Sequence, residues 1–167
     1  MTLLEFISAK LGFLPGDSDP KHEKMAMKGS LTAVLTHPDG STETRFKDNI
    51  IVNGGFDAIC DSIGNSGTRP ACMGYIELGT GSTAPASTQT TLTTALLRQA
   101  AAYAHTAGTQ TFTFTATFAP GAATGAIQEA GVFNAASAGI MLDRVTFAVI
   151  NKGASDTLTA TFQFTLS

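Results

Sequence analysis

The sequence predicts an all-β protein: an antiparallel β-sandwich, jelly-roll-like, with an N-terminal amphipathic helical arm and one short internal helix. The clearest observation is the segment Thr109 to Phe118, where phenylalanine and alanine alternate with threonine at the period of two that is typical of a half-buried strand. The second observation is that about eight short segments of this kind follow one another at regular spacing along residues 28–166, with a turn between each segment and the next. The third is a change of period to 3.6 in the first fourteen residues.

Length and composition fit one domain with a short appendage. The chain has 167 residues, of which 43% are apolar, so it can build an ordinary core without metal or disulfide staples. Only 14% of the residues are charged, against about 25% in typical soluble domains. The polar surface must therefore consist largely of hydroxyl and amide groups.

Charge and cysteine usage exclude several classes of protein. The formal net charge is −3 and the ten Lys and Arg are scattered, so no binding surface for nucleic acid is predicted. No apolar run approaches the length of a membrane span and the first residues do not read as a signal peptide, so we expect a soluble protein made in the cytoplasm. Cys60 and Cys72 are expected to be reduced, structural thiols.

The N-terminal region divides into an arm over residues 1–15 and a linker over residues 16–28, which precede a β-sandwich domain over residues 29–167. The arm is predicted to be helical because its large apolar residues fall on one face at helical spacing. They are Leu3, Leu4, Phe6, Ile7, Leu11, Phe13 and Leu14. This stripe is too apolar to remain in water, so the seven residues are predicted to form a protein interface. The sequence leaves open whether the arm folds back on its own domain or docks on a neighbouring subunit.

The first half of the β domain is predicted to hold a hairpin and the internal helix. Residues 28–36 and 42–46 alternate in polarity around the turn Pro38-Asp39-Gly40. The helix follows the pair Gly54-Gly55. One face of this helix is predicted to carry Val52, Phe56, Ile59, Cys60 and Ile63.

The second half is predicted to alternate strands with loops. A strand at residues 73–78 runs into Gly79-Thr80-Gly81, and residues 82–94 form a surface loop because they are almost entirely Thr, Ser, Ala and Pro. Further strands are expected at residues 96–107, 109–118, 126–134, 142–151 and 157–166.

No cluster of catalytic or metal-binding residues is readable in the chain. The three histidines, His22, His37 and His105, do not have the spacing of a metal site. The Gly79-Thr80-Gly81-Ser82 segment invites a phosphate-loop interpretation, but neither a Lys-Ser/Thr pair nor a helix start follows it, which favours a tight turn. We therefore expect no enzymatic activity, no metal and no cofactor.

Two of the charged residues in predicted strands have apolar neighbours along the chain. Glu129 lies within an apolar strand and Arg98 follows two leucines in another. A charge in a strand is either on the wet face or paired. We predict that Arg98 and Glu129 form a structural ion pair across the sheet, which would fix strand register.

Several short motifs resemble a family of small structural proteins of the tailed-bacteriophage virion. They are Asn53-Gly54-Gly55-Phe56, Tyr75-Ile76-Glu77-Leu78-Gly79-Thr80-Gly81, Ala84-Pro85, Thr91-Leu92, Arg98 and Gln128-Glu129-Ala130-Gly131-Val132-Phe133-Asn134. The resemblance covers about residues 48–166. It implies a virion protein made in the host cytoplasm and similar to head decoration or cement proteins, with the major capsid protein and copies of itself, as a dimer or trimer, as partners. The same resemblance extends to tail-fibre and baseplate-associated proteins, so the alternative is a module that binds a host receptor or glycan near residues 82–94.

Overall fold

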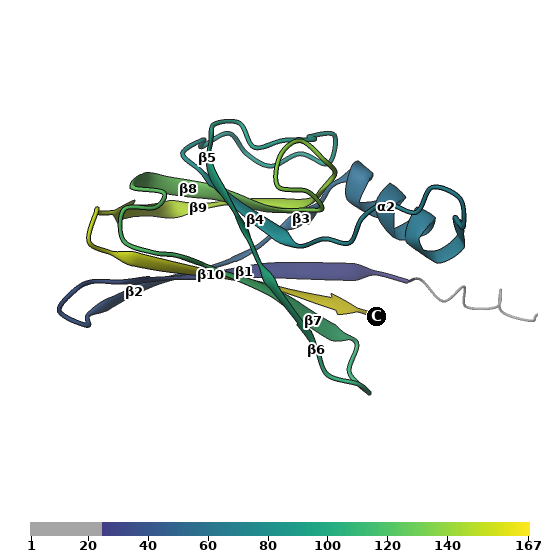
Figure 1. Ribbon diagram of the computed structural model, residues 1–167, viewed down its shortest axis with the longest axis horizontal. Coiled ribbons are helices and arrows are strands. Elements are labelled where there is room, and N and C mark those ends of the chain that lie inside the picture. The colour runs from purple at the N-terminus through teal and green to yellow at the C-terminus, as the bar shows by residue number, and fades with distance from the viewer. Residues whose placement is uncertain (1–24) are drawn as a thin grey trace, which may run out of the picture.

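The computed structural model describes residues 25–167 as two antiparallel five-stranded sheets that face each other, with one helix at the end of the sandwich (Figure 1). The first sheet contains, in spatial order, β2 (Thr42–Asp48), β1 (Met27–Thr36), β10 (Thr157–Leu166), β7 (Thr111–Phe118) and β6 (Ala102–His105). The second contains β3 (Ile50–Ile51), β9 (Met141–Lys152), β8 (Gly125–Phe133), β4 (Tyr75–Gly79) and β5 (Ala95–Ala100). The helix is α2 (Asn53–Gly64). The predicted all-β sandwich is confirmed.

Early strands pair with late ones in a nested series, which is the jelly-roll-like feature of the winding. β1 pairs with β10, β3 with β9, β4 with β8 and β6 with β7. At one edge the chain passes from the first sheet to the second between β2 and β3, and at the other edge it passes back between β5 and β6 (Figure 1). Strands that change sheets in this way form the corners of a sandwich. The single predicted strand at residues 96–107 is therefore two strands, divided at Ala101.

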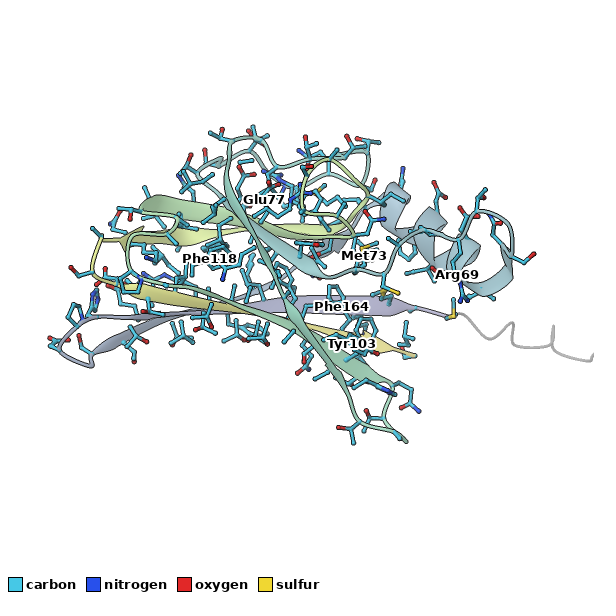
Figure 2. All side chains as sticks on the ribbon, in the orientation of Figure 1. Arg69, Met73, Glu77, Tyr103, Phe118 and Phe164 are labelled. Atoms are coloured by element: carbon cyan, nitrogen blue, oxygen red, sulfur yellow. The ribbon has the colours of Figure 1, made fainter. Side chains whose placement is uncertain are left out.

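The core lies between the sheets and is built from alternate residues of each strand. Phe118 and Phe164 have no exposed surface, and Figure 2 shows Phe118 between the two sheets. On the outer face of the first sheet, threonine hydroxyls of β7 and β10 pair across the strands, with Thr115 Oγ1 3.1 Å from Thr161 Oγ1. The predicted division of residues 109–118 into a phenylalanine face and a threonine face is confirmed.

The predicted helix after the glycine pair is also present, but it turns a different face to the sandwich. Gly55 and Ala58 are its buried residues. A β-carbon at Gly55 would collide with the Leu142 carbonyl oxygen, so the helix backbone approaches β9 too closely for a larger side chain. Phe56 and Ile63 consequently stay 46% and 75% exposed. Phe56 and Ile63 lie on one face of the helix, as predicted, but the sandwich contacts a different face.

The remaining predicted elements agree with the structure, apart from the start of the β domain. The hairpin of β1 and β2 turns at Gly40, whose φ of 85° suits glycine. β1 begins at Met27 rather than at residue 29, because the backbones of Ala26 and Ser167 exchange two hydrogen bonds of 2.6 and 2.9 Å that extend its pairing with β10. The predicted arm and most of the linker lie outside the described residues. Within residues 25–167, no helix is long and apolar enough to cross a membrane.

Candidate functional site

The long polar loop between β4 and β5, residues 80–94, covers the outer face of the second sheet. Most of its residues are exposed, as the composition predicts, but Leu92 is only 5% exposed. Leu92 packs in a small second core with Val52, Phe133 and Met141. The part of the second sheet around Phe133 is therefore covered on both faces, by the first sheet on one side and by this loop on the other.

A single buried carboxylate fixes both ends of the loop. Glu129 Oε1 accepts hydrogen bonds from the backbone N–H groups of Gly81, at 2.9 Å, and Thr94, at 2.7 Å. Glu129 Oε2 accepts one from Thr93 N–H at 3.0 Å. In the segment that invites a phosphate-loop interpretation, the Gly81 N–H thus binds the protein's own anion, and the Thr80 N–H binds the Thr94 carbonyl oxygen.

Arg144 on β9 completes this arrangement. Its Nε and Nη2 donate to Glu129 Oε2 at 3.1 and 2.6 Å, and both side chains are fully buried. The same guanidinium donates to the Thr83 carbonyl oxygen at 3.0 Å and to Gln89 Oε1 at 3.0 Å. One planar cation therefore connects the strand to the middle of the loop as well as to its end.

Two glycines make room for the carboxylate. A β-carbon at Gly79 would stand 2.6 Å from Glu129 Oε1, and one at Gly81 would be closer still. These distances are shorter than real contacts of a β-carbon allow. The motif Gly79-Thr80-Gly81 is therefore explained by the close approach of Glu129.

The pKa of Glu129 reflects the balance of burial and hydrogen bonding. Burial alone raises the pKa of this carboxyl group, but the Arg144 guanidinium and the N–H groups of Thr93, Thr94 and Gly81 outweigh it. The net pKa lies below the ordinary value, so Glu129 is ionised at neutral pH. The Glu129–Arg144 ion pair makes its remaining hydrogen bonds to residues of the loop, so its role in this structure is to position the loop.

The predicted pairing of Arg98 with Glu129 is wrong. β4 lies between β5 and β8, and it places Glu77 directly opposite Arg98. Arg98 Nη2 binds Glu77 Oε2 at 3.0 Å, and its guanidinium carbon lies 3.6 Å from the centre of the Phe133 ring. Figure 2 shows Glu77 on the side of the second sheet that faces away from Phe118. Both predicted residues are in ion pairs, but each has a different partner.

Arg98 also holds the turn between β8 and β9. Its Nη1 donates to the carbonyl oxygens of Ala135, at 2.9 Å, and Ala138, at 2.6 Å. Ala138 has a φ of 51°, a left-handed conformation that a residue with a β-carbon seldom adopts. The arginine therefore stabilises a strained turn beside the loop.

A second buried carboxyl group, Asp143, lies next to Arg144 in the sequence. Asp143 Oδ1 accepts the Val132 N–H at 3.0 Å, and its Oδ2 is 2.5 Å from Asn49 Nδ2. Burial raises the pKa of Asp143 to about 8, against the effect of these two hydrogen bonds. Asp143 and Arg144 are not among the residues predicted from the sequence, although two consecutive charges between Leu142 and Val145 are a signal that could have found them.

An open groove of about 460 Å³ borders the loop, between β2 and the hairpin of β8 and β9. It is lined by residues that include Arg45, Phe46, Lys47, Ser82 and Gln128. Phe46 is 66% exposed. The groove therefore offers an aromatic ring, two cations and hydroxyl groups to a ligand.

The other candidate residues are not brought together. His37 lies in the turn after β1 and His105 at the end of strand β6, and residues 25–167 hold no group of three His, Cys, Asp or Glu that could bind a metal. Cys60 and Cys72 are both free and exposed. The predicted interface residues of the arm, Leu3 to Leu14, lie outside the described part of the chain, as does His22.

Comparison with known proteins adds no relative. The chain matches no protein-family model, no curated protein and no solved structure.

Proposed function

We propose that this chain is a non-enzymatic structural protein of a tailed-bacteriophage particle, a decoration or cement protein that binds and stabilises the head shell. The resemblance in the sequence motifs supports this proposal. So does the use of those motifs in the structure, because Gly79, Gly81, Arg98 and Glu129 all hold one loop and one turn against the second sheet. Residues so engaged build a rigid module.

The observation that carries the proposal is the distribution of exposed apolar side chains. Among the described residues, Phe46 on edge strand β2 is 66% exposed, Tyr103 on edge strand β6 is 59% exposed and Leu96 on edge strand β5 is 43% exposed. Large apolar groups on the periphery of a module are suited to contacts with other subunits. We propose the major capsid protein and further copies of this chain, as a dimer or trimer, as those subunits.

In this role each copy would add a modest buried area to the shell. At about 25 cal/mol for each Å² of apolar surface removed from water, individual contacts of this kind are weak. Many copies on one shell act together, because each bound subunit holds its neighbours at high effective concentration. The low charged fraction of the chain also favours dense packing.

Labelling of intact particles tests the proposal. Antibodies raised against the purified full chain would be applied to phage particles from the source strain and located by immunogold electron microscopy. Label distributed over the head is the expected result. Label confined to the tail tip, or particles that carry none of the protein, would contradict a role in the head shell.

A module of a tail fibre or baseplate that binds a host receptor or glycan is the alternative, and one observation favours it. The loop at residues 80–94 presents exposed hydroxyl groups from a backbone that Glu129 and Arg144 hold in place. Ser82 connects that surface to the groove with the exposed ring of Phe46. Pre-ordered polar groups beside an aromatic ring are suited to sugars, because little conformational entropy is lost on binding.

Binding of the full chain to host cells and to a glycan array tests this alternative. Phe46→Ala should abolish the binding if the groove is the site. Ile63→Ala is a matched control, because Ile63 is also exposed but lies on α2, away from the groove. Equal binding by both variants, or none by the unaltered chain, would eliminate the groove as a receptor site.

A further inference from the structure

Helix α2 carries a continuous apolar stripe that residues 25–167 leave mostly uncovered, with only Ile59 partly buried against the core between the sheets. The stripe consists of Phe56, Ile59, Cys60 and Ile63, which follow helical spacing. Phe56 and Ile63 are 46% and 75% exposed, and Cys60 is exposed. A helix that seats Gly55 and Ala58 on the sheet must turn this face outward.

An apolar cavity of about 160 Å³ continues the stripe toward the sandwich. It is lined by side chains that include Met27, Ile59, Cys72, Met73, Phe112 and Leu166. Figure 2 shows Met73 on the chain segment beside α2, and Figure 1 shows the C-terminus at this same end of the sandwich. The stripe and the cavity together form one surface, which we name the α2 groove.

The chain outside the described residues begins at this groove. Met27 lines the cavity, and Met25, two residues earlier, is 73% exposed. The arm over residues 1–15 is predicted to be helical with its apolar face between Leu3 and Leu14, and α2 itself has 12 residues. At about 1.5 Å per residue, two helices of this length would lie side by side along roughly 18 Å.

The tether between the two is long enough for this arrangement. Residues 15–26 connect Leu14 to Met27, and an extended chain spans up to about 3.3 Å per residue. A segment tethered so closely has an effective concentration in the millimolar range, far above that of a second copy in dilute solution. The same chain is therefore the favoured source of the occupant.

We propose that residues 3–14 dock as an amphipathic helix in the α2 groove of their own chain. The apolar face with Ile7 and Leu11 would pack on Phe56 and Ile63, which removes apolar surface from water on both sides. The docked helix would also cover Cys60 and Cys72. This inference concerns the isolated chain and does not depend on the proposed role in a virion.

Alkylation of the two thiols in the full-length protein tests the docking. The rate at which N-ethylmaleimide modifies Cys60 and Cys72 would be followed by mass spectrometry at low micromolar protein concentration. We expect Ile7→Glu combined with Leu11→Glu to raise both rates about tenfold or more, because the thiols then react without prior opening of the arm. Ser8→Glu combined with Ala9→Glu adds the same charge on the polar face of the predicted helix and should leave both rates unchanged.

A variant on the other side of the contact gives an independent measurement. Ile63→Glu should also raise the rate at Cys72, and it should leave the sandwich folded, since Ile63 is 75% exposed. Equal rates in the unaltered chain, in both arm variants and in Ile63→Glu would overturn the proposal. If the protection of the two thiols from alkylation disappears on hundredfold dilution and light scattering gives the mass of a dimer, docking within the same chain is overturned and the groove is assigned to a second copy.

Discussion

Arg144 and Glu129 form an ion pair with no exposed side-chain surface, and the distance from Arg144 Nη2 to Glu129 Oε2 is 2.6 Å. The pair lies under the loop at residues 80–94 and binds it through the backbone of Thr93 and the carbonyl oxygen of Thr83. An ion pair buried this way contributes little net stability, yet the loss of one partner is costly because the other charge is left uncompensated. Its main effect is to select one conformation of the loop.

Replacement of one partner should therefore be more harmful than replacement of both. We expect Glu129→Gln to reduce the free energy of unfolding by about 3–5 kcal/mol, because the Arg144 cation then stays buried without a counter-charge. The double variant Glu129→Gln with Arg144→Met removes that charge and should lose less. Urea unfolding of both variants measures the difference. A single variant as stable as the unaltered protein would show that the pair is not needed to hold the loop.

The carboxyl group of Asp143 should make stability depend on pH. Its pKa in the folded protein is raised to about 8 by burial, whereas an unfolded chain has an ordinary Asp pKa of about 4. Between these two values the unfolded chain has lost the proton and the folded chain has kept it, so stability falls as pH rises from about 4 to about 8. The contribution is complete below the unfolded pKa and is lost as pH passes through the folded pKa.

Asp143→Asn tests this dependence. The amide is neutral at every pH, and its oxygen can still accept the Val132 N–H. We expect the variant to show a flatter profile of unfolding free energy against pH and to be more stable than the unaltered protein at pH 8, by a few kcal/mol. Identical slopes for the two proteins between pH 5 and pH 8 would mean that Asp143 is ionised in the folded state.

The sequence predicts most of the fold because the alternation of apolar and polar residues is local. Thr109 to Phe118 shows its buried face directly, and the turn at Gly40 needs only the residues on either side of it. The partners of buried charges depend on sheet order instead. Arg98 lies opposite Glu77 because β4 happens to separate β5 from β8, and no spacing in the sequence carries that information.

The buried face of α2 could not be predicted for a related reason. Helical periodicity favours the face with the largest apolar side chains, which includes Phe56 and Ile63. The structure seats the face with Gly55 and Ala58 instead, because close backbone approach to β9 leaves space only for small residues. Periodicity identifies an apolar stripe, but it does not say which partner covers it.

This close approach predicts a difference between two glycines of the same helix. Gly55→Ala should destabilise the protein by about 1–3 kcal/mol, because the new β-carbon would overlap the Leu142 carbonyl oxygen and force the helix away from β9. Gly64→Ala is the matched control: a β-carbon there meets no atom within 4 Å. The control should be neutral or slightly stabilising, since alanine favours helix over glycine. Thermal unfolding monitored by circular dichroism distinguishes the two, and equal effects would contradict a tight contact at Gly55.

The last prediction concerns His37, which connects the turn of β1 and β2 to the turn of β9 and β10. Its Nδ1 lies 2.9 Å from Asp156 Oδ1 and its Nε2 lies 3.6 Å from Glu43 Oε1. The hydrogen bond to Asp156, more than the neighbouring charge of Glu43, raises the pKa of His37 above its ordinary 6.5 against the effect of burial. A raised histidine pKa adds stability that is complete below the pKa of the unfolded chain and is lost as pH rises through the pKa of the folded protein.

The test uses an Asp143→Asn background, which removes the pH dependence of stability that Asp143 causes in the same range. In this background we expect stability to fall as pH rises past 6.5, and we expect His37→Gln to abolish that fall. His105→Gln is the control, because the His105 ring contacts the Thr109 carbonyl oxygen and no carboxylate of the described residues. Titration of the imidazole signals by NMR measures the His37 pKa directly, and a value at or below 6.5 would show that the two turns are not coupled through this ring.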